Sequence, residues 1–115
     1  MVPTLWTVRI GPAANTDLKN IVRWTVAKFG SAQARSYAQT LDAALQELRG
    51  GPQVLGGKPA GDFAPGVLML HVARQGRAGR HFVVFRVGEA KGQNVIDVLR
   101  ILHDSMDVMR HLAPH

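Results

Sequence analysis

The sequence predicts an α+β fold in which an antiparallel β-sheet, built from an N-terminal strand and a C-terminal three-strand meander, packs against an α-helical hairpin. Three observations predict it: an alternating N-terminal segment, two helical apolar patterns in succession, and three later runs rich in Val, Leu, Ile and Phe. At 115 residues, the chain is expected to form one domain over residues 1–115.

The first strand is expected at residues 5–10, where large and polar side chains alternate before a Gly-Pro pair. Asn15 or Thr16 can cap the helix that follows, with Asp17 in its first turn. Apolar side chains then recur on one helical face, at Leu18, Ile21, Val22, Thr25 and Phe29. This pattern predicts an amphipathic helix that ends at Gly30.

A second helix is expected at residues 31–49, because apolar residues again recur at helical spacing. They are Ala34, Tyr37, Ala38, Leu41, Ala44, Leu45 and Leu48. A connection this short between two amphipathic helices requires an antiparallel hairpin. Residues 50–66 hold six Gly and three Pro, which predicts an irregular loop.

The meander is expected from strands at residues 67–73, 80–87 and 95–102, joined by short segments that contain Gly. Two of these strands are apolar on both faces, so a terminal helical segment at residues 105–112 or a partner chain should cover the second face. Core contacts are expected from Leu18, Ile21, Val22, Leu41, Leu45, Val84 and Leu99.

The charge balance favours acidic partners. Fourteen Lys and Arg against eight Asp and Glu give a net charge of +6, and ten of the cations are Arg. Arginine suits phosphate and carboxylate, so nucleic acid, an acidic groove and an acidic peptide all fit, as does a basic surface without a specific partner. The absence of cysteine excludes disulfides and thiol chemistry and favours the reducing cytoplasm. No stretch approaches the apolar length of a membrane span.

Four arginines are candidates for binding phosphate or a target: Arg74, Arg77, Arg80 and Arg86. No acidic residue lies within residues 71–86, which contain all four. The alternative is an exposed hairpin tip that arginine keeps soluble. His103 could act as an acid or base, or serve as a structural hydrogen-bonding group. Arg100 lies in an apolar strand, where Asp104 or Asp107 could pair with it.

The sequence favours neither a metal nor a cofactor. No pair of histidines has metal-ligand spacing together with a third ligand. No Gly-rich segment follows a strand and opens a helix, as a nucleotide-binding loop would require. We therefore expect a protein without metal, nucleotide or other cofactor.

Several motifs resemble those of a known family. Residues 17–24 read DLKNIVRW, and residues 45–52 read LQELRGGP before the Gly-rich loop. Residues 77–87 read RAGRHFVVFRV, and residues 96–107 read IDVLRILHDSMD. Together they resemble the RelE/ParE superfamily of type II toxins, with the last motif similar to the C-terminal signature of ParE. The chain departs from that signature at Met106, where Arg is common.

The resemblance implies the toxin of a bacterial type II toxin–antitoxin pair, neutralised by a cognate antitoxin. ParE-like members inhibit DNA gyrase, which predicts a non-enzymatic toxin without catalytic residues. RelE-like members instead cleave mRNA on the ribosome, and in that alternative the candidate catalytic residues would be His81, His103 and Arg100. The last strand and terminal segment lack the Lys, Arg and Tyr grouping of RelE-like nucleases, which favours gyrase.

Overall fold

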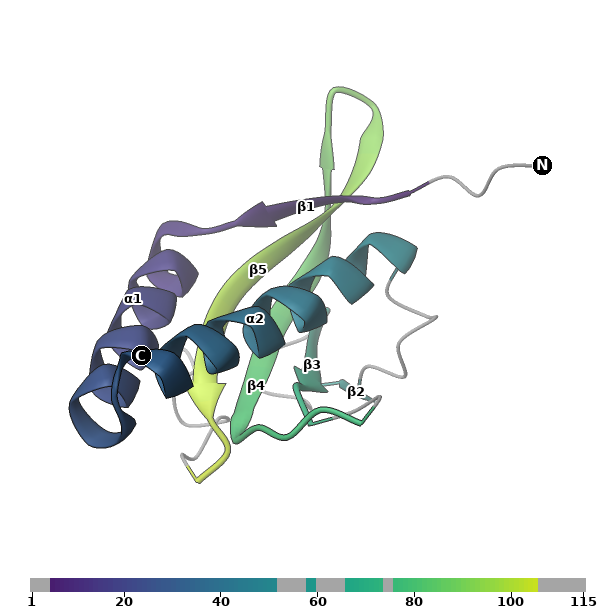
Figure 1. Ribbon diagram of the computed structural model, residues 1–115. Coiled ribbons are helices and arrows are strands. Elements are labelled where there is room, and N and C mark those ends of the chain that lie inside the picture. Colours follow the sequence, from purple (N-terminus) through teal and green to yellow (C-terminus); the bar gives the residue numbers. More distant parts are fainter. Residues whose placement is uncertain (1–4, 52–57, 60–65, 74–75, 106–115) are drawn as a thin grey trace.

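The computed structural model of the protein describes residues 5–51, 58–59, 66–73 and 76–105. The elements in chain order are β1 (Thr7–Ile10), α1 (Pro12–Phe29), α2 (Ser31–Glu47), the 3-10 turn η1 (Leu48–Gly50), β2 (Lys58–Pro59), β3 (Val67–His71), β4 (His81–Ala90) and β5 (Gln93–His103). Helix α2 crosses one face of the sheet, and α1 lies beside β5 (Figure 1). The predicted α+β fold with a helical hairpin is confirmed.

The sheet is mixed rather than wholly antiparallel, which corrects the prediction. Its strand order is β1-β5-β4-β3-β2, and β1 runs parallel to β5 while the other pairs are antiparallel. A parallel pair needs a long crossover connection, and the helical hairpin supplies the first part of it. The predicted loop at residues 50–66 also contains β2, which adds a two-residue edge strand to β3.

Helix α1 begins three residues before the predicted capping residue Asn15. Gly11 is the N-cap in an extended conformation, and Pro12 occupies the first helical position. Proline suits that position because its fixed φ is helical and its missing N–H would have no partner there. The Gly-Pro pair therefore ends the strand and starts the helix, and Asp17 lies beyond the first turn.

One residue joins the two helices. Gly30 has φ +90° and donates its N–H to the carbonyl of Val26 at 2.9 Å, while its own carbonyl accepts from Ala34 at 3.1 Å. A residue with a side chain is strained at this φ, so glycine both ends α1 and starts α2. This tight connection confirms the predicted antiparallel hairpin.

The β4–β5 hairpin is longer than predicted. The loop expected over residues 88–94 is instead a two-residue turn at Lys91 and Gly92, both with positive φ, and the strands pair up to Ala90 and Gln93. Two positive φ values match the right-handed twist of the strands that the turn joins. The polar residues of this segment form the part of the hairpin that extends past the neighbouring strands (Figure 1).

The main core lies between α2 and the sheet. Leu41, Leu45 and Leu48 pack against strand residues that include Phe85 and Ile96. Leu18 and Ile21 are partly buried against the same cluster, as predicted. Phe29, predicted on the buried face of α1, is 64% exposed because the helix ends there. Val22 is partly buried but is not among the residues of this core.

A smaller apolar cluster lies on the other face of the sheet. Val84 and Leu102 are buried there, with Val67, Met69 and Phe82 packed against them. Val84 is thus a core residue of this face and not of the helical face. Residue pairing shifts between Val84 and Phe85, so Leu99 falls at a β-bulge and is only partly buried, contrary to the prediction. Most of the predicted terminal helix, residues 106–112, lies outside the described residues.

Candidate functional site

The three residues of the nuclease alternative line one hollow. His81 and His103 face each other across β4 and β5, with ring centroids 5.2 Å apart. Arg100 lies on the same strand as His103, and all three border a cavity of about 280 Å³ between α1 and β5. Trp24 of α1 borders it as well. Three residues that were selected from the sequence, His81, His103 and Arg100, are therefore close in space.

Arg100 is paired with a residue of α1, which corrects the predicted pairing with Asp104 or Asp107. The Asp17 carboxylate accepts from Arg100 Nε at 2.8 Å and from a terminal guanidinium nitrogen at 3.1 Å. It also accepts from the Ile101 backbone N–H at 2.9 Å. Strand β1 ends before this point of β5, so Asp17 occupies the strand edge that β1 leaves open. The pair raises the pKa of Arg100 and ties α1 to the sheet.

His81 belongs to a hydrogen-bond network with α2. The Tyr37 hydroxyl accepts from the Arg80 backbone N–H at 3.1 Å and lies 2.7 Å from His81 Nδ1. Burial, helped by the neighbouring His103, lowers the pKa of His81 to about 4. An imidazole with this pKa is neutral at pH 7, so its Nδ1 can accept a hydrogen bond from the Tyr37 hydroxyl. Burial in turn raises the pKa of Tyr37.

A carboxylate lies beside this network. Asp104 is 3.0 Å from His71 Nε2, and it accepts from Arg80 Nε at 3.1 Å. Hydrogen bonds from His71 and then from Arg80 hold the pKa of Asp104 below its usual range. His103, whose Nδ1 is 2.7 Å from the Ser105 hydroxyl, lies 3.7 Å from the same carboxylate. These contacts hold His71 and His103 at the ends of β3 and β5.

The predicted phosphate-binding arginines do not form one cluster of free cations. Arg77 is paired with Glu47 and its side chain is 17% exposed. Arg80 is paired with Asp104, and Arg86 lies 3.9 Å from Asp97. The acidic partners come from distant segments, so the acid-free sequence around the arginines did not indicate them. Arg80 and Arg86 keep much of their surface exposed, whereas Arg74 lies outside the described residues.

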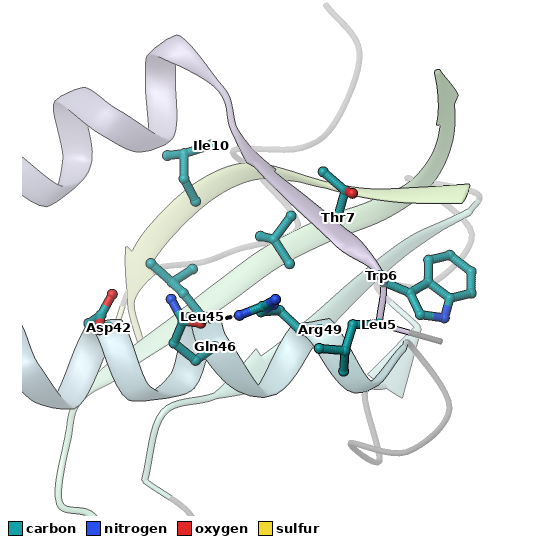
Figure 2. Close-up of a pocket in the computed structure, with 9 residues that line it drawn as sticks. Leu5, Trp6, Thr7, Ile10, Asp42, Leu45, Gln46 and Arg49 are labelled. Carbon is teal, nitrogen blue, oxygen red and sulfur yellow. Dashed lines mark hydrogen bonds between the residues drawn. The ribbon is translucent and has the colours of Figure 1, made fainter. Parts of the chain in front are cut away.

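A second concave surface lies between β1 and α2. This groove measures about 400 Å³. In Figure 2, Leu5 lies beside Arg49, and Leu45 and Gln46 follow along the helix. The Trp6 backbone N–H donates to the Arg49 carbonyl at 2.8 Å, which fixes the start of β1 against η1. Leu5 is 58% exposed at the mouth of this groove.

Some residues of these sites were not indicated by the sequence. Tyr37 was predicted only as part of the apolar face of α2, although its hydroxyl contacts His81 and the Arg80 N–H at the start of β4. Trp24 falls off the apolar stripe of α1 and is 55% exposed. The position of Trp24, a large aromatic residue on the polar face of an amphipathic helix, could have indicated that it contributes to a binding surface. His71 gave no such indication, because its partner Asp104 is distant in sequence.

Comparison with known proteins identifies the family. The family described as "ParE toxin of type II toxin-antitoxin system, parDE" matches residues 8–108. The chain is 33% identical over 103 residues to Toxin ParE1 of Mycobacterium tuberculosis, which covers 90% of this chain and 94% of that protein. It is 32% identical over 100 residues to Toxin ParE of Escherichia coli, covering 87% and 86%.

A solved structure shares the fold. It is titled "Chromosomal ParDE TA system from P. aeruginosa" and matches with a TM-score of 0.67 at 22% identity, over 87% of this chain and 97% of that chain. The fold and the sequence matches define a small toxin of the type II class. The chain belongs to the ParE toxin family of type II toxin–antitoxin systems. No helix within the described residues is long and apolar enough to cross a membrane.

Proposed function

We propose that this ParE-family toxin inhibits DNA gyrase in the cytoplasm and is neutralised by an acidic antitoxin that binds in the groove between β1 and α2. The observation that carries the antitoxin part is the groove itself, which combines exposed apolar side chains with an open strand edge. Family membership supports the gyrase part, because ParE-like toxins inhibit that enzyme.

The groove suits an extended or helical segment of a partner. Strand β1 is the first strand of the sheet order and pairs only with β5 among the described strands, so its other edge is available for backbone hydrogen bonds. Leu5 and Ile10, which are 58% and 39% exposed, offer apolar contacts along it. Arg49 borders the groove, so an acidic residue of the partner could meet it, whereas Arg9 of β1 lies outside the lining and is paired with Asp97. Asp42 also borders the groove, which favours a partner whose acidic residues face Arg49.

Co-expression with the product of the adjacent small gene tests antitoxin binding. The two proteins should co-purify, and Leu5→Asp or Ile10→Asp should weaken the complex, because each places a charge among apolar contacts and repels an acidic partner. Val87→Asp is the matched control, since Val87 is a strand residue 45% exposed outside the groove. Separate elution of the two proteins at low salt and micromolar concentration would refute antitoxin binding. Equal weakening by the control would refute the groove.

The RNA-cleavage alternative has one observation in its favour, because His81, His103 and Arg100 line one hollow. Three features weigh against it. A base with a pKa of about 4 accepts a proton poorly at neutral pH, and Nδ1 of His81 is already bonded to Tyr37. Arg100 is occupied by Asp17. The arginine of this hollow that would stabilise a scissile phosphate is therefore already paired with a carboxylate.

A comparison of wild type with His81→Ala and His103→Ala separates the two functions. The purified chain should leave mRNA intact on ribosomes, so neither substitution should change the cleavage pattern from background. Cleavage by the wild type that either substitution abolishes would instead support a RelE-like nuclease. Each positioned proton-transfer group would account for about 10²–10⁴-fold in rate, which makes the difference easy to detect.

A further inference from the structure

A hollow at the bend of the helical hairpin is lined mainly by rings. It measures about 310 Å³ and lies where α1 and α2 meet the starting end of β4 and the final end of β5. Its ring-bearing lining residues are Trp24, Phe29, Tyr37, His81 and His103. Gln33 and Arg80 add polar groups, and the cavity of about 280 Å³ bordered by Arg100 shares Trp24 and both histidines with it. The two cavities therefore adjoin around Trp24.

The rings form two contacting groups, one exposed and one fixed. Trp24 and Phe29 meet edge to face at 5.9 Å and are 55% and 64% exposed. Behind them, Tyr37 and His81 lie 5.5 Å apart, and His81 contacts His103. The hydrogen bonds of Tyr37 and His81 hold the inner rings in place. Exposed indole and phenyl rings beside a rigid ring-lined floor suit a flat, aromatic ligand.

The helical hairpin that borders the hollow is basic. Residues 18–41, which span most of both helices, contain no acidic residue and carry four cations: Lys19, Arg23, Lys28 and Arg35. All four are exposed, and none is ion-paired with another described residue. The nearby carboxylates, Asp17 and Asp104, are held by arginines. A ligand at this bend would therefore meet unpaired positive charge.

We propose that the ring-lined hollow at the helical bend binds unpaired nucleotides of single-stranded nucleic acid, with one base stacked on Trp24, a neighbouring base stacked on Phe29, and the flanking phosphates held by Arg23, Lys28 and Arg80. Stacking platforms flanked by cations are the usual means of binding single strands without reading their sequence. This site is separate from the groove proposed for the antitoxin, and the inference does not depend on gyrase inhibition. No bond is made or broken.

Binding is measured with the purified full chain and two fluorescent probes, a short oligothymidylate and a short oligouridylate, which distinguish DNA from RNA as the source. The Trp6→Phe variant leaves Trp24 as the sole tryptophan, and its fluorescence should be quenched on binding because the base stacks on the indole. The logarithm of the affinity should fall with the logarithm of salt concentration, with a slope of about −0.7 for each phosphate contacted. Absence of binding to both probes at low salt would overturn the proposal.

Substitutions separate stacking from simple charge attraction. Trp24→Ala and Phe29→Ala should each weaken binding about 5- to 150-fold, the range expected for one lost base–aromatic stack. Val26→Ala, at an exposed residue of the same helix outside the hollow, should leave affinity unchanged. Unchanged affinity in Trp24→Ala, with circular dichroism showing a folded protein, would overturn the proposal.

A charge comparison tests the role of the cations. Lys28→Gln should weaken binding and reduce the salt slope, whereas Lys91→Gln, at the β4–β5 turn, should do neither. Poly-glutamate serves as the acidic-protein competitor and should displace the oligonucleotide poorly because it offers no base to stack. Equal displacement by poly-glutamate would show that the surface binds any acidic chain, including a protein, and would overturn a nucleotide site.

Discussion

Replacing Asp17 with Asn should lower the free energy of unfolding by about 1.5–3 kcal/mol, the usual value of a hydrogen bond to a charged group. The Asp17 carboxylate accepts three hydrogen bonds, two from Arg100 and one from the Ile101 N–H. An Asn oxygen can still accept one of them, and Arg100, with 34% of its side chain exposed, can turn to water. The estimated loss is therefore less than the sum of three bonds.

Thermal and urea unfolding measure the effect. At about 4 °C per kcal/mol for a domain of this size, Tm should fall by roughly 6–12 °C. Asp42→Asn is the matched control, because this carboxylate is exposed on α2, and the change should stay within about 0.5 kcal/mol. In the double mutant with Arg100→Gln, the two losses should not add, because both remove the same contact. A loss no larger than that of the control, or strictly additive losses, would refute the assigned role of Asp17.

Three further predictions concern the end of the sheet near the histidines. The pKa of His81 is lowered to about 4 in the folded state, so the unfolded chain binds the proton more readily. The free energy of unfolding should therefore fall as pH drops from about 6.5 to 4, and His81→Gln should reduce this fall in unfolding curves. Tyr37→Phe should cost about 1–3 kcal/mol, at about 0.5–1.5 for each bond to His81 and the Arg80 N–H, and a loss below about 0.5 would contradict the network. Gly79→Ala should cost about 1–3 kcal/mol, since its Cβ would clash with the side chain of buried Val72; unchanged denaturation would show that the site has room.

The helices and strands could be predicted because their patterns are local. Helical spacing at Leu41, Leu45 and Leu48 and the apolar runs of β3, β4 and β5 are visible over a few turns or residues. Strand direction is not visible in this way, so the parallel pairing of β1 with β5 was missed. The bulge at Leu99 also depends on pairing between strands and not on the apolar run that contains it.

The candidate site was predicted in part. His81, His103 and Arg100 were named from the sequence, and the structure brings them to one hollow. Their partners could not be named, because Asp17 is 83 residues from Arg100 and Tyr37 is 44 residues from His81. Ion pairs and hydrogen bonds over such separations depend on the tertiary fold, which no local pattern encodes.

The proposed inhibition of gyrase is tested most directly by a supercoiling assay with purified gyrase and the purified chain. Supercoiling should fall as the chain is titrated in, and addition of the cognate antitoxin should restore it. Groove variants such as Leu5→Asp should still inhibit gyrase but should resist the antitoxin, because they alter only the neutralising contact. Undiminished supercoiling at a large excess of folded chain, with mRNA cleaved on ribosomes by the same preparation, would contradict the account.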